Sequence, residues 1–128
     1  MSIQHRIITQ DVHLLKLNRP LVGHEAEELE EHFEQLHRQG ASELYLDIAE
    51  VSFMDSRGLE ALIRGLRLFG GERDRLRLLS PQTQPALLLN LTGFDRFLLI
   101  EMADGAAVKI ERAQPAKRRL RSQVAVAA

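Results

Sequence analysis

Apolar and polar positions along the chain follow first the spacing of strands and then the spacing of helices. Two short apolar runs, residues 3–9 and 12–17, are typical of β-strands, and Gln10-Asp11 between them predicts a tight hairpin connection. Over residues 25–38 the apolar side chains recur every three and four positions, which is typical of a helix with one buried face. The chain therefore opens with a hairpin that is followed by an amphipathic helix.

The remaining pattern alternates between short strands and helices. Strands are predicted at residues 44–48, 76–79 and 97–100, and a helix at residues 56–69. Ser80-Pro81 and Thr83 are expected to start a third helix, and Gly93 to stop it. Asp104 is expected to cap a short fourth helix. This order predicts an α/β fold, with a mixed sheet of four to five strands packed with about four helices.

The third helix is harder to orient, because leucines occupy most of its length. We expect Leu87, Leu88 and Leu91 to face the core, which leaves Leu89 outside the apolar stripe. Neither an internal repeat nor a linker between two cores is visible. We therefore expect one domain over residues 1–113 and a disordered basic tail over residues 114–128.

The net charge of −1 conceals an uneven distribution of charge along the chain. Residues 112–128 contain five basic side chains and no acidic one, so residues 1–111 carry a net charge of −6. An acidic domain does not attract nucleic acid. The chain has no cysteine and no apolar run of the length that spans a membrane, and its first residues lack the apolar stretch of a signal peptide. We expect a cytoplasmic protein without disulfides.

The densest group of chemically active side chains lies between the third strand and the second helix. We expect Val51 and Phe53 to anchor this loop, and Asp55 or Ser56 to cap the helix that follows. Gly58 falls in the first helical turn, where a glycine has a reason if another group approaches the backbone closely. Taken alone, a serine at such a place is most simply a helix cap.

Four segments of the chain together resemble the STAS family, which comprises bacterial anti-sigma factor antagonists and related domains of sulfate transporters. They are Leu44-Tyr45-Leu46-Asp47, then Phe53-Met54-Asp55-Ser56-Arg57-Gly58-Leu59 with Leu62, and then Leu76-Arg77-Leu78-Leu79-Ser80 followed by Leu88, Asn90-Leu91-Thr92-Gly93-Phe94. The resemblance extends over residues 7–102. It implies a protein that acts by binding another protein, with neither cofactor nor metal.

In this family the serine of the Asp-Ser segment is phosphorylated by the anti-sigma factor, a serine kinase, and phosphorylation reverses binding. The matching residue here is Ser56, and the resemblance implies a partner-binding site made of Asp55, Ser56, Arg57 and Gly58. An alternative is a STAS scaffold or regulatory subunit in a stressosome-type or lipid-transport assembly. The oligomeric state stays open.

Enzyme chemistry fits the same residues poorly. A nucleophile elbow requires glycine two residues before the serine, and Met54 stands there instead. Gly70-Gly71 is not followed by the lysine of a phosphate-binding loop. The five histidines lack the spacing of metal ligands and are expected at the surface, and loop capping is favoured over Mg²⁺ binding for Asp47 and Asp55. A small hydrolase that uses Ser56 is the least favoured function.

Overall fold

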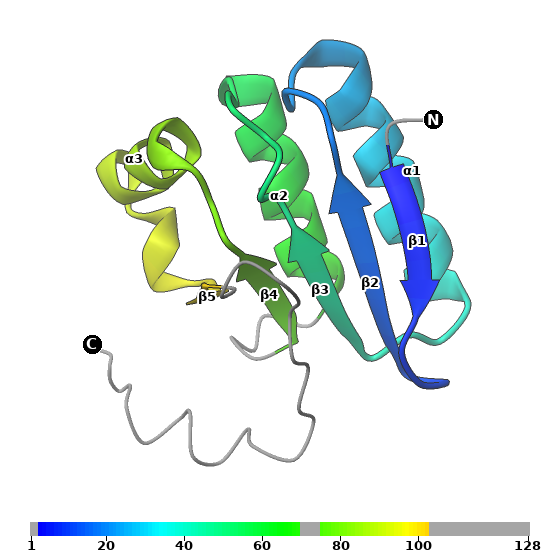
Figure 1. Ribbon diagram of the computed structural model, residues 1–128. Helices are drawn as coiled ribbons and strands as arrows, with labels where there is room; N and C mark the ends of the chain where they lie inside the picture. Colours follow the sequence, from blue (N-terminus) through cyan, green and yellow to red (C-terminus); the bar gives the residue numbers. More distant parts are fainter. Residues whose placement is uncertain (1–2, 70–74, 103–128) are drawn as a thin grey trace.

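The computed structural model, which describes residues 3–69 and 75–102, contains one five-stranded mixed sheet. The strands are β1 (Ile3–Ile7), β2 (Val12–Leu17), β3 (Glu43–Asp47), β4 (Leu76–Leu79) and β5 (Leu99–Glu101), and they lie in that order across the sheet. β1 and β2 form an antiparallel hairpin, and each later strand is parallel to its neighbour (Figure 1). The predicted α/β fold with a mixed sheet is confirmed.

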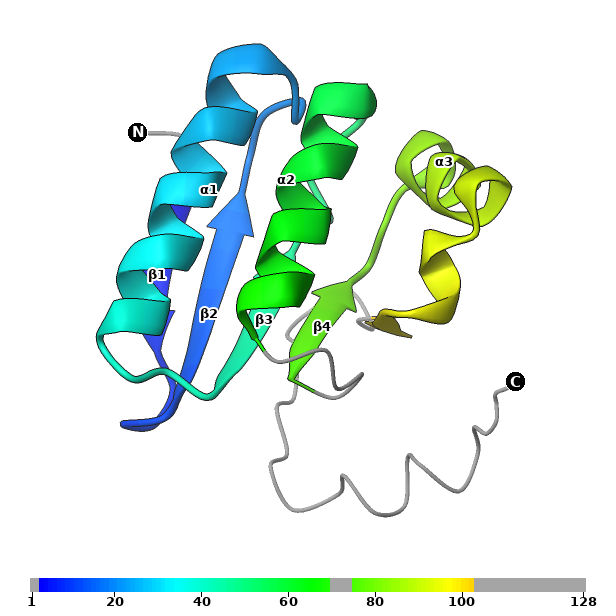
Figure 2. The ribbon, with the colours of Figure 1, turned by 180° about the vertical axis from the view of Figure 1, so that it is seen from behind.

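Two helices lie side by side on one face of this sheet. α1 (Gly23–Arg38) and α2 (Ser56–Leu68) are behind the sheet in Figure 1 and in front of it in Figure 2. The buried side chains of α1 are those that the spacing predicted: Ala26, Leu29, Phe33 and Leu36. Gly65 of α2 lies against the Phe33 ring, and a Cβ on this glycine would be 2.5 Å from Cε2 of the ring. The absence of a side chain at position 65 therefore lets the two helices approach closely.

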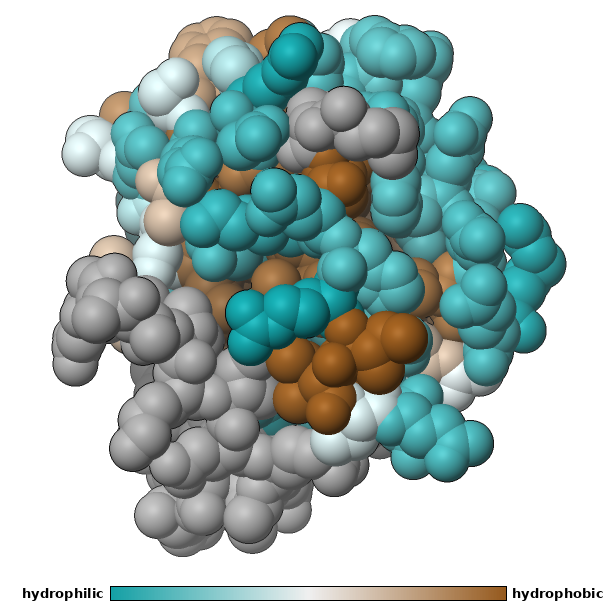
Figure 3. All heavy atoms as spheres, turned by 45° about the vertical axis from the view of Figure 1, so that its right-hand side comes forward, coloured by the Kyte–Doolittle hydropathy of each residue, from teal (hydrophilic) through white to brown (hydrophobic). Residues whose placement is uncertain are grey.

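The outer face of α1 is acidic and exposed. Glu27 and Glu31 are exposed. On the side of the domain that Figure 3 presents, the described surface is largely hydrophilic around one hydrophobic patch near the lower centre. Glu34, at the border with α2, accepts a hydrogen bond from Arg64 with 2.6 Å between the two atoms. The glutamates thus form a solvated face that also contributes ion pairs to the neighbouring helix.

α3 (Thr83–Thr92) has the opposite orientation to the one predicted from its leucines. Leu89 is completely buried, whereas Leu87 and Leu91 are 52% and 73% exposed. Leu88 is partly buried against the core. The prediction was wrong because α3 is apolar on every side, so that periodicity alone does not identify its inner face. The helix ends as predicted at Gly93, which has a left-handed conformation with φ of 81°.

A smaller apolar cluster lies on the face of the sheet opposite to α1 and α2. It contains Val12, Leu14, Tyr45 and Leu79, which alternate along their strands with residues of the main core. Arg77 is only 1% exposed, and its guanidinium lies over the Tyr45 ring and donates a hydrogen bond to the Tyr45 hydroxyl. A charged side chain is therefore accommodated on this face through a hydrogen bond and a cation–π contact.

The last part of the described chain differs in detail from the prediction. A short 3₁₀-helix, η1 (Phe94–Arg96), follows α3, and β5 begins two residues later than predicted. The described residues contain three α-helices rather than about four, and the helix expected near Asp104 lies outside them, as does the tail over residues 114–128. None of the described helices has the length and apolar character needed to cross a membrane.

Candidate phosphorylation and partner-binding site

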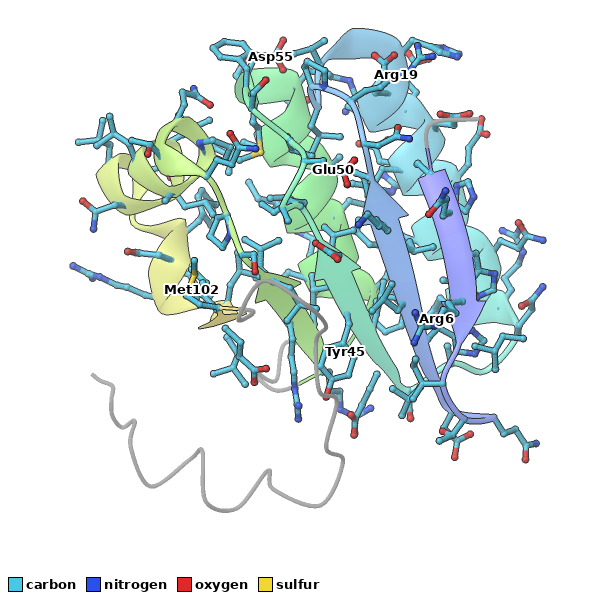
Figure 4. The ribbon with its side chains drawn as sticks, viewed as in Figure 1. Arg6, Arg19, Tyr45, Glu50, Asp55 and Met102 are labelled. Atoms are coloured by element: carbon cyan, nitrogen blue, oxygen red, sulfur yellow. The ribbon has the colours of Figure 1, made fainter. Side chains whose placement is uncertain are left out.

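The segment between β3 and α2, residues 48–55, brings the predicted site to one end of the sheet. The parallel strands end there, and the helices that follow them begin there (Figure 1). Asp55 lies at this end, and so does Arg19 from the connection between β2 and α1 (Figure 4). In α/β folds the carboxyl ends of parallel strands are the usual place for binding sites. The topology thus presents the β3–α2 segment at the edge of the domain.

Three apolar side chains of the β3–α2 segment anchor it to the core. Ile48, Val51 and Met54 are each 1% exposed. The prediction for Val51 is confirmed, whereas Phe53 is 47% exposed and does not anchor the loop. Side chains of successive residues in an extended segment point to opposite sides, so burial of Met54 turns Phe53 outward.

Asp55, and not Ser56, caps α2. Asp55 has an extended backbone, and its Oδ1 accepts a hydrogen bond from the N–H of Gly58 at 2.9 Å. This satisfies one of the N–H groups that the first helical turn leaves free. The sequence left the cap open between the two residues, and the structure assigns it to the aspartate.

Ser56 is the first residue of α2 and is exposed. Its neighbour supplies the cap, so the start of the helix does not depend on the Ser56 hydroxyl. The positive end of the helix dipole lies at this position, and it favours an added negative charge. The geometry therefore combines access from solvent with a local field that tolerates a phosphate.

Arg57 connects α2 to α1 through a bidentate ion pair. Its two terminal nitrogens donate to the carboxylate of Glu30, with distances of 2.7 and 3.2 Å between the paired atoms. The hydrogen bond from Arg57 lowers the pKa of Glu30 below its ordinary value, although partial burial acts in the opposite direction. The guanidinium is thereby held on the α1 side of the site.

Gly58 is required by a contact inside the domain. A Cβ at this position would be 2.3 Å from the carbonyl oxygen of Leu21 and 2.8 Å from Cγ of Met54. Leu21 belongs to the connection between β2 and α1, and it forms an isolated parallel bridge with Met54. The close approach that a glycine permits here is thus made by the backbone of Leu21.

The remaining candidates for metal chemistry have structural contacts. Asp47 accepts a hydrogen bond from the N–H of Ala49 at 3.0 Å, which is the loop-capping role expected for it. His13 is 6% exposed, so the prediction of a surface position was wrong for this histidine; it lies 2.8 Å from a ring nitrogen of His5. Among residues 3–69 and 75–102, no group of three histidine or carboxylate side chains is placed to bind a metal.

Two glutamines at the start of α3 contact the β3–α2 segment. The sequence pattern does not predict a role for either of them. Gln84 bonds to both backbone polar groups of Met54, and Nε2 of Gln82 donates to the carbonyl of Ala49 at 2.7 Å. Neither glutamine belongs to a recognisable motif, and both are about 30 residues away from their partners. Their contacts become visible only when α3 is placed beside the segment.

Comparison with known proteins agrees with the resemblance of the sequence to the STAS family. A family profile of the STAS domain matches residues 5–107. The anti-sigma factor antagonist SpoIIAA in its unphosphorylated form is similar in structure, with a TM-score of 0.69 at 21% sequence identity, covering 94% of this chain and 96% of that one. The phosphorylated form of the Bacillus cell fate determinant SpoIIAA has a TM-score of 0.65 at 21% identity and covers 93% of this chain and 99% of that one.

A third structure, of a candidate anti-sigma factor antagonist from Thermotoga maritima, has a TM-score of 0.70 at 22% identity. The alignment covers 93% of this chain and 94% of that one. At such identities the likeness establishes the fold. No curated protein sequence matches the chain.

Proposed function

Because the chain belongs to the STAS family, we propose that it is an anti-sigma factor antagonist that binds an anti-sigma factor kinase and is switched off when that kinase phosphorylates Ser56. The observation that carries this proposal is the exposed Ser56 at the first position of α2, beside a cap that Asp55 supplies. The hydroxyl is accessible to a kinase, and its modification leaves the cap in place.

Phosphorylation of Ser56 acts on the interface and leaves the fold intact. A phosphate at the start of α2 is stabilised by the free N–H groups and the dipole of the helix. It adds a charge of about −1.5 to −2 next to the Asp55 carboxylate, and this charge must be desolvated against a partner surface that fits a neutral hydroxyl. A cost of about 3 kcal/mol in the complex lowers affinity by about a hundredfold.

The neighbours of Ser56 have separate roles in this proposal. Asp55 holds the first turn of α2, so the hydroxyl is presented from a fixed backbone. Arg57 borders the interface while it is paired with Glu30. Gly58 allows Leu21 to pack beneath the site, and its effect on the partner is indirect. The kinase supplies ATP and the catalytic base, so this chain is substrate and ligand and not an enzyme.

Purified protein, its anti-sigma factor kinase and ATP provide the test. Mass spectrometry should find one phosphate, on Ser56. Ser56→Ala should bind with nearly unchanged affinity, because it removes a hydroxyl and adds no charge. Ser56→Asp should fold normally and bind at least about tenfold more weakly, because an added charge must be desolvated in the interface.

A matched control is Ser52→Asp, which places the same charge at another exposed serine of the β3–α2 segment. It should weaken binding less than Ser56→Asp. Equal affinity of wild type and Ser56→Asp would contradict the switch. A pull-down that recovers a transporter ATPase instead of a kinase would favour the regulatory subunit of a lipid-transport assembly.

A further inference from the structure

The backbone of Met54 is held by one side chain from a distant part of the sequence. Its N–H donates to Oε1 of Gln84 at 2.8 Å, and its carbonyl oxygen accepts from Nε2 of the same amide at 3.0 Å. Met54 is 1% exposed. A single planar group thus satisfies both polar groups of a buried residue, and loss of that group would leave both without these partners.

The opposite side of the same stretch pairs with the connection between β2 and α1. The N–H of Leu21 donates to the carbonyl oxygen of Phe53 at 2.9 Å, within the isolated bridge between Leu21 and Met54. Backbone groups of successive residues in a strand point to opposite sides. Residues 53–55 therefore resemble a short strand outside the five-stranded sheet. The Leu21 backbone pairs with this short strand at the isolated bridge on one side, and the Gln84 amide takes the place of a neighbouring strand on the other.

We propose that Gln84 is a positioning residue for the phosphorylation site: its amide fixes Met54, and through Met54 it fixes the cap at Asp55 and the exposed hydroxyl of Ser56 in the arrangement that the kinase recognises. This inference rests on the proposed function. Ser56 is two residues from Met54, so a displacement of the short strand is transmitted directly to the start of α2. Gln84 itself does not need to touch the kinase.

The chemistry of the contact requires an amide of this length. Glutamine offers one donor and one acceptor on the same plane, whereas an ionised glutamate offers acceptors only and repels the Met54 carbonyl. Methionine has a similar length without the two hydrogen-bonding groups. Gln84→Met therefore removes the contact, and Gln84→Glu makes it depend on protonation of the new carboxyl group.

Gln82 provides a matched control. Its amide makes one hydrogen bond, to the carbonyl of Ala49 at the other end of the β3–α2 segment, and that bond is exposed. Gln82→Met is the same chemical change two residues away. It leaves the contacts of Met54 in place.

Hydrogen exchange and phosphorylation kinetics together test the proposal in the full chain. Gln84→Met should lower protection of the Met54 amide at least about tenfold, which is the factor expected for one lost hydrogen bond. Its kcat/KM as a substrate of the kinase should also fall at least about tenfold, because small displacements of a reacting group have effects of this size. Gln82→Met should stay within about threefold of wild type in both measurements.

The Gln84→Glu variant separates positioning from a general loss of stability. Its protonated carboxyl group again offers one acceptor and one donor. The amide resonance of Met54 should therefore move back toward its wild-type position as the pH falls through the pKa of the new glutamate. The same resonance in Gln84→Met should not show this transition.

The outcomes are distinct for the two proposals. Absence of phosphate on wild-type Ser56 would contradict the proposed function itself. If wild type is phosphorylated on Ser56 and Gln84→Met has the same kcat/KM, the role of Gln84 is overturned while the proposed function stands. Unchanged protection of the Met54 amide in Gln84→Met would overturn the contact on which the inference depends.

Discussion

α2 and α3 both begin at the end of the sheet that carries the candidate site, yet they are built in different ways. α2 has a side-chain cap from Asp55 and one well-defined apolar face against the core. α3 has no side-chain cap at Gln82, and it exposes two leucines while it buries Leu89 and Pro85. Its first residues hold the β3–α2 segment through amide side chains.

The difference shows when the inner face of a helix can be predicted from the sequence. Charged residues mark the outer face of α2, so the apolar positions that remain identify the inner face. α3 has no charged residue, and its leucines occupy both faces. Polar positions are thus the informative ones, because an apolar side chain at the surface costs little whereas an unpaired charge in the core costs much.

The largest effect is expected from the leucines of α3. Leu89→Ala should lower the free energy of unfolding by about 2–5 kcal/mol, because it leaves a cavity under the helix. Leu91→Ala should change it by no more than about 0.5 kcal/mol, because that side chain is largely in solvent. Urea denaturation of the two variants gives both values. The reverse order would mean that α3 has the orientation predicted from its leucines.

A smaller effect is expected where α2 packs on α1. Gly65→Ala should destabilise the domain by about 1–3 kcal/mol, because the new Cβ overlaps the ring of Phe33. Thermal unfolding measures the loss. The double variant with Phe33→Leu should recover part of it, since the smaller side chain leaves room. If Gly65→Ala is as stable as wild type, the two helices do not pack as closely as described.

Loss of the α2 cap should lower the free energy of unfolding by less than the substitution at Gly65. Asp55→Ala should lower the free energy of unfolding by about 1 kcal/mol, because the N–H of Gly58 loses its acceptor. Ser56→Ala should change stability by less than about 0.5 kcal/mol, because the cap is intact. Chemical denaturation distinguishes the two. Equal losses in both variants would mean that the serine shares the capping role.

The smallest effect is expected from the ion pair between Glu30 and Arg57, and it should depend on pH. The bond from Arg57 lowers the pKa of Glu30 below its ordinary value of 4.5. Its stabilisation is therefore complete above that value and is lost as the pH falls through the lower pKa of the folded state. In thermal unfolding, wild type should have a higher melting temperature than Glu30→Gln at neutral pH. This difference should disappear at strongly acidic pH. A difference that stays constant over this range would contradict the assignment.

The features of the site that depend on neighbouring residues could be predicted from the sequence. Those that depend on residues far apart in the sequence could not. The start of α2 at Ser56 and the burial of Val51 are local, and they were predicted. The choice between Asp55 and Ser56 as the cap was left open, because both side chains are suitable acceptors one residue apart. The outward position of Phe53 depends on which of two neighbouring apolar side chains enters the core, and packing decides that.

The sequence by itself determined the order of the elements, the mixed sheet and the place of the exposed serine, because hydrophobic spacing and helix signals are properties of adjacent residues. The tertiary structure decided the inner face of α3 and the partners of Gly58, Arg57 and Met54. Leu21, Glu30 and Gln84 are each 27 residues or more from those partners. Such contacts exist only after the chain has brought the carboxyl ends of its parallel strands together, and no local pattern encodes them.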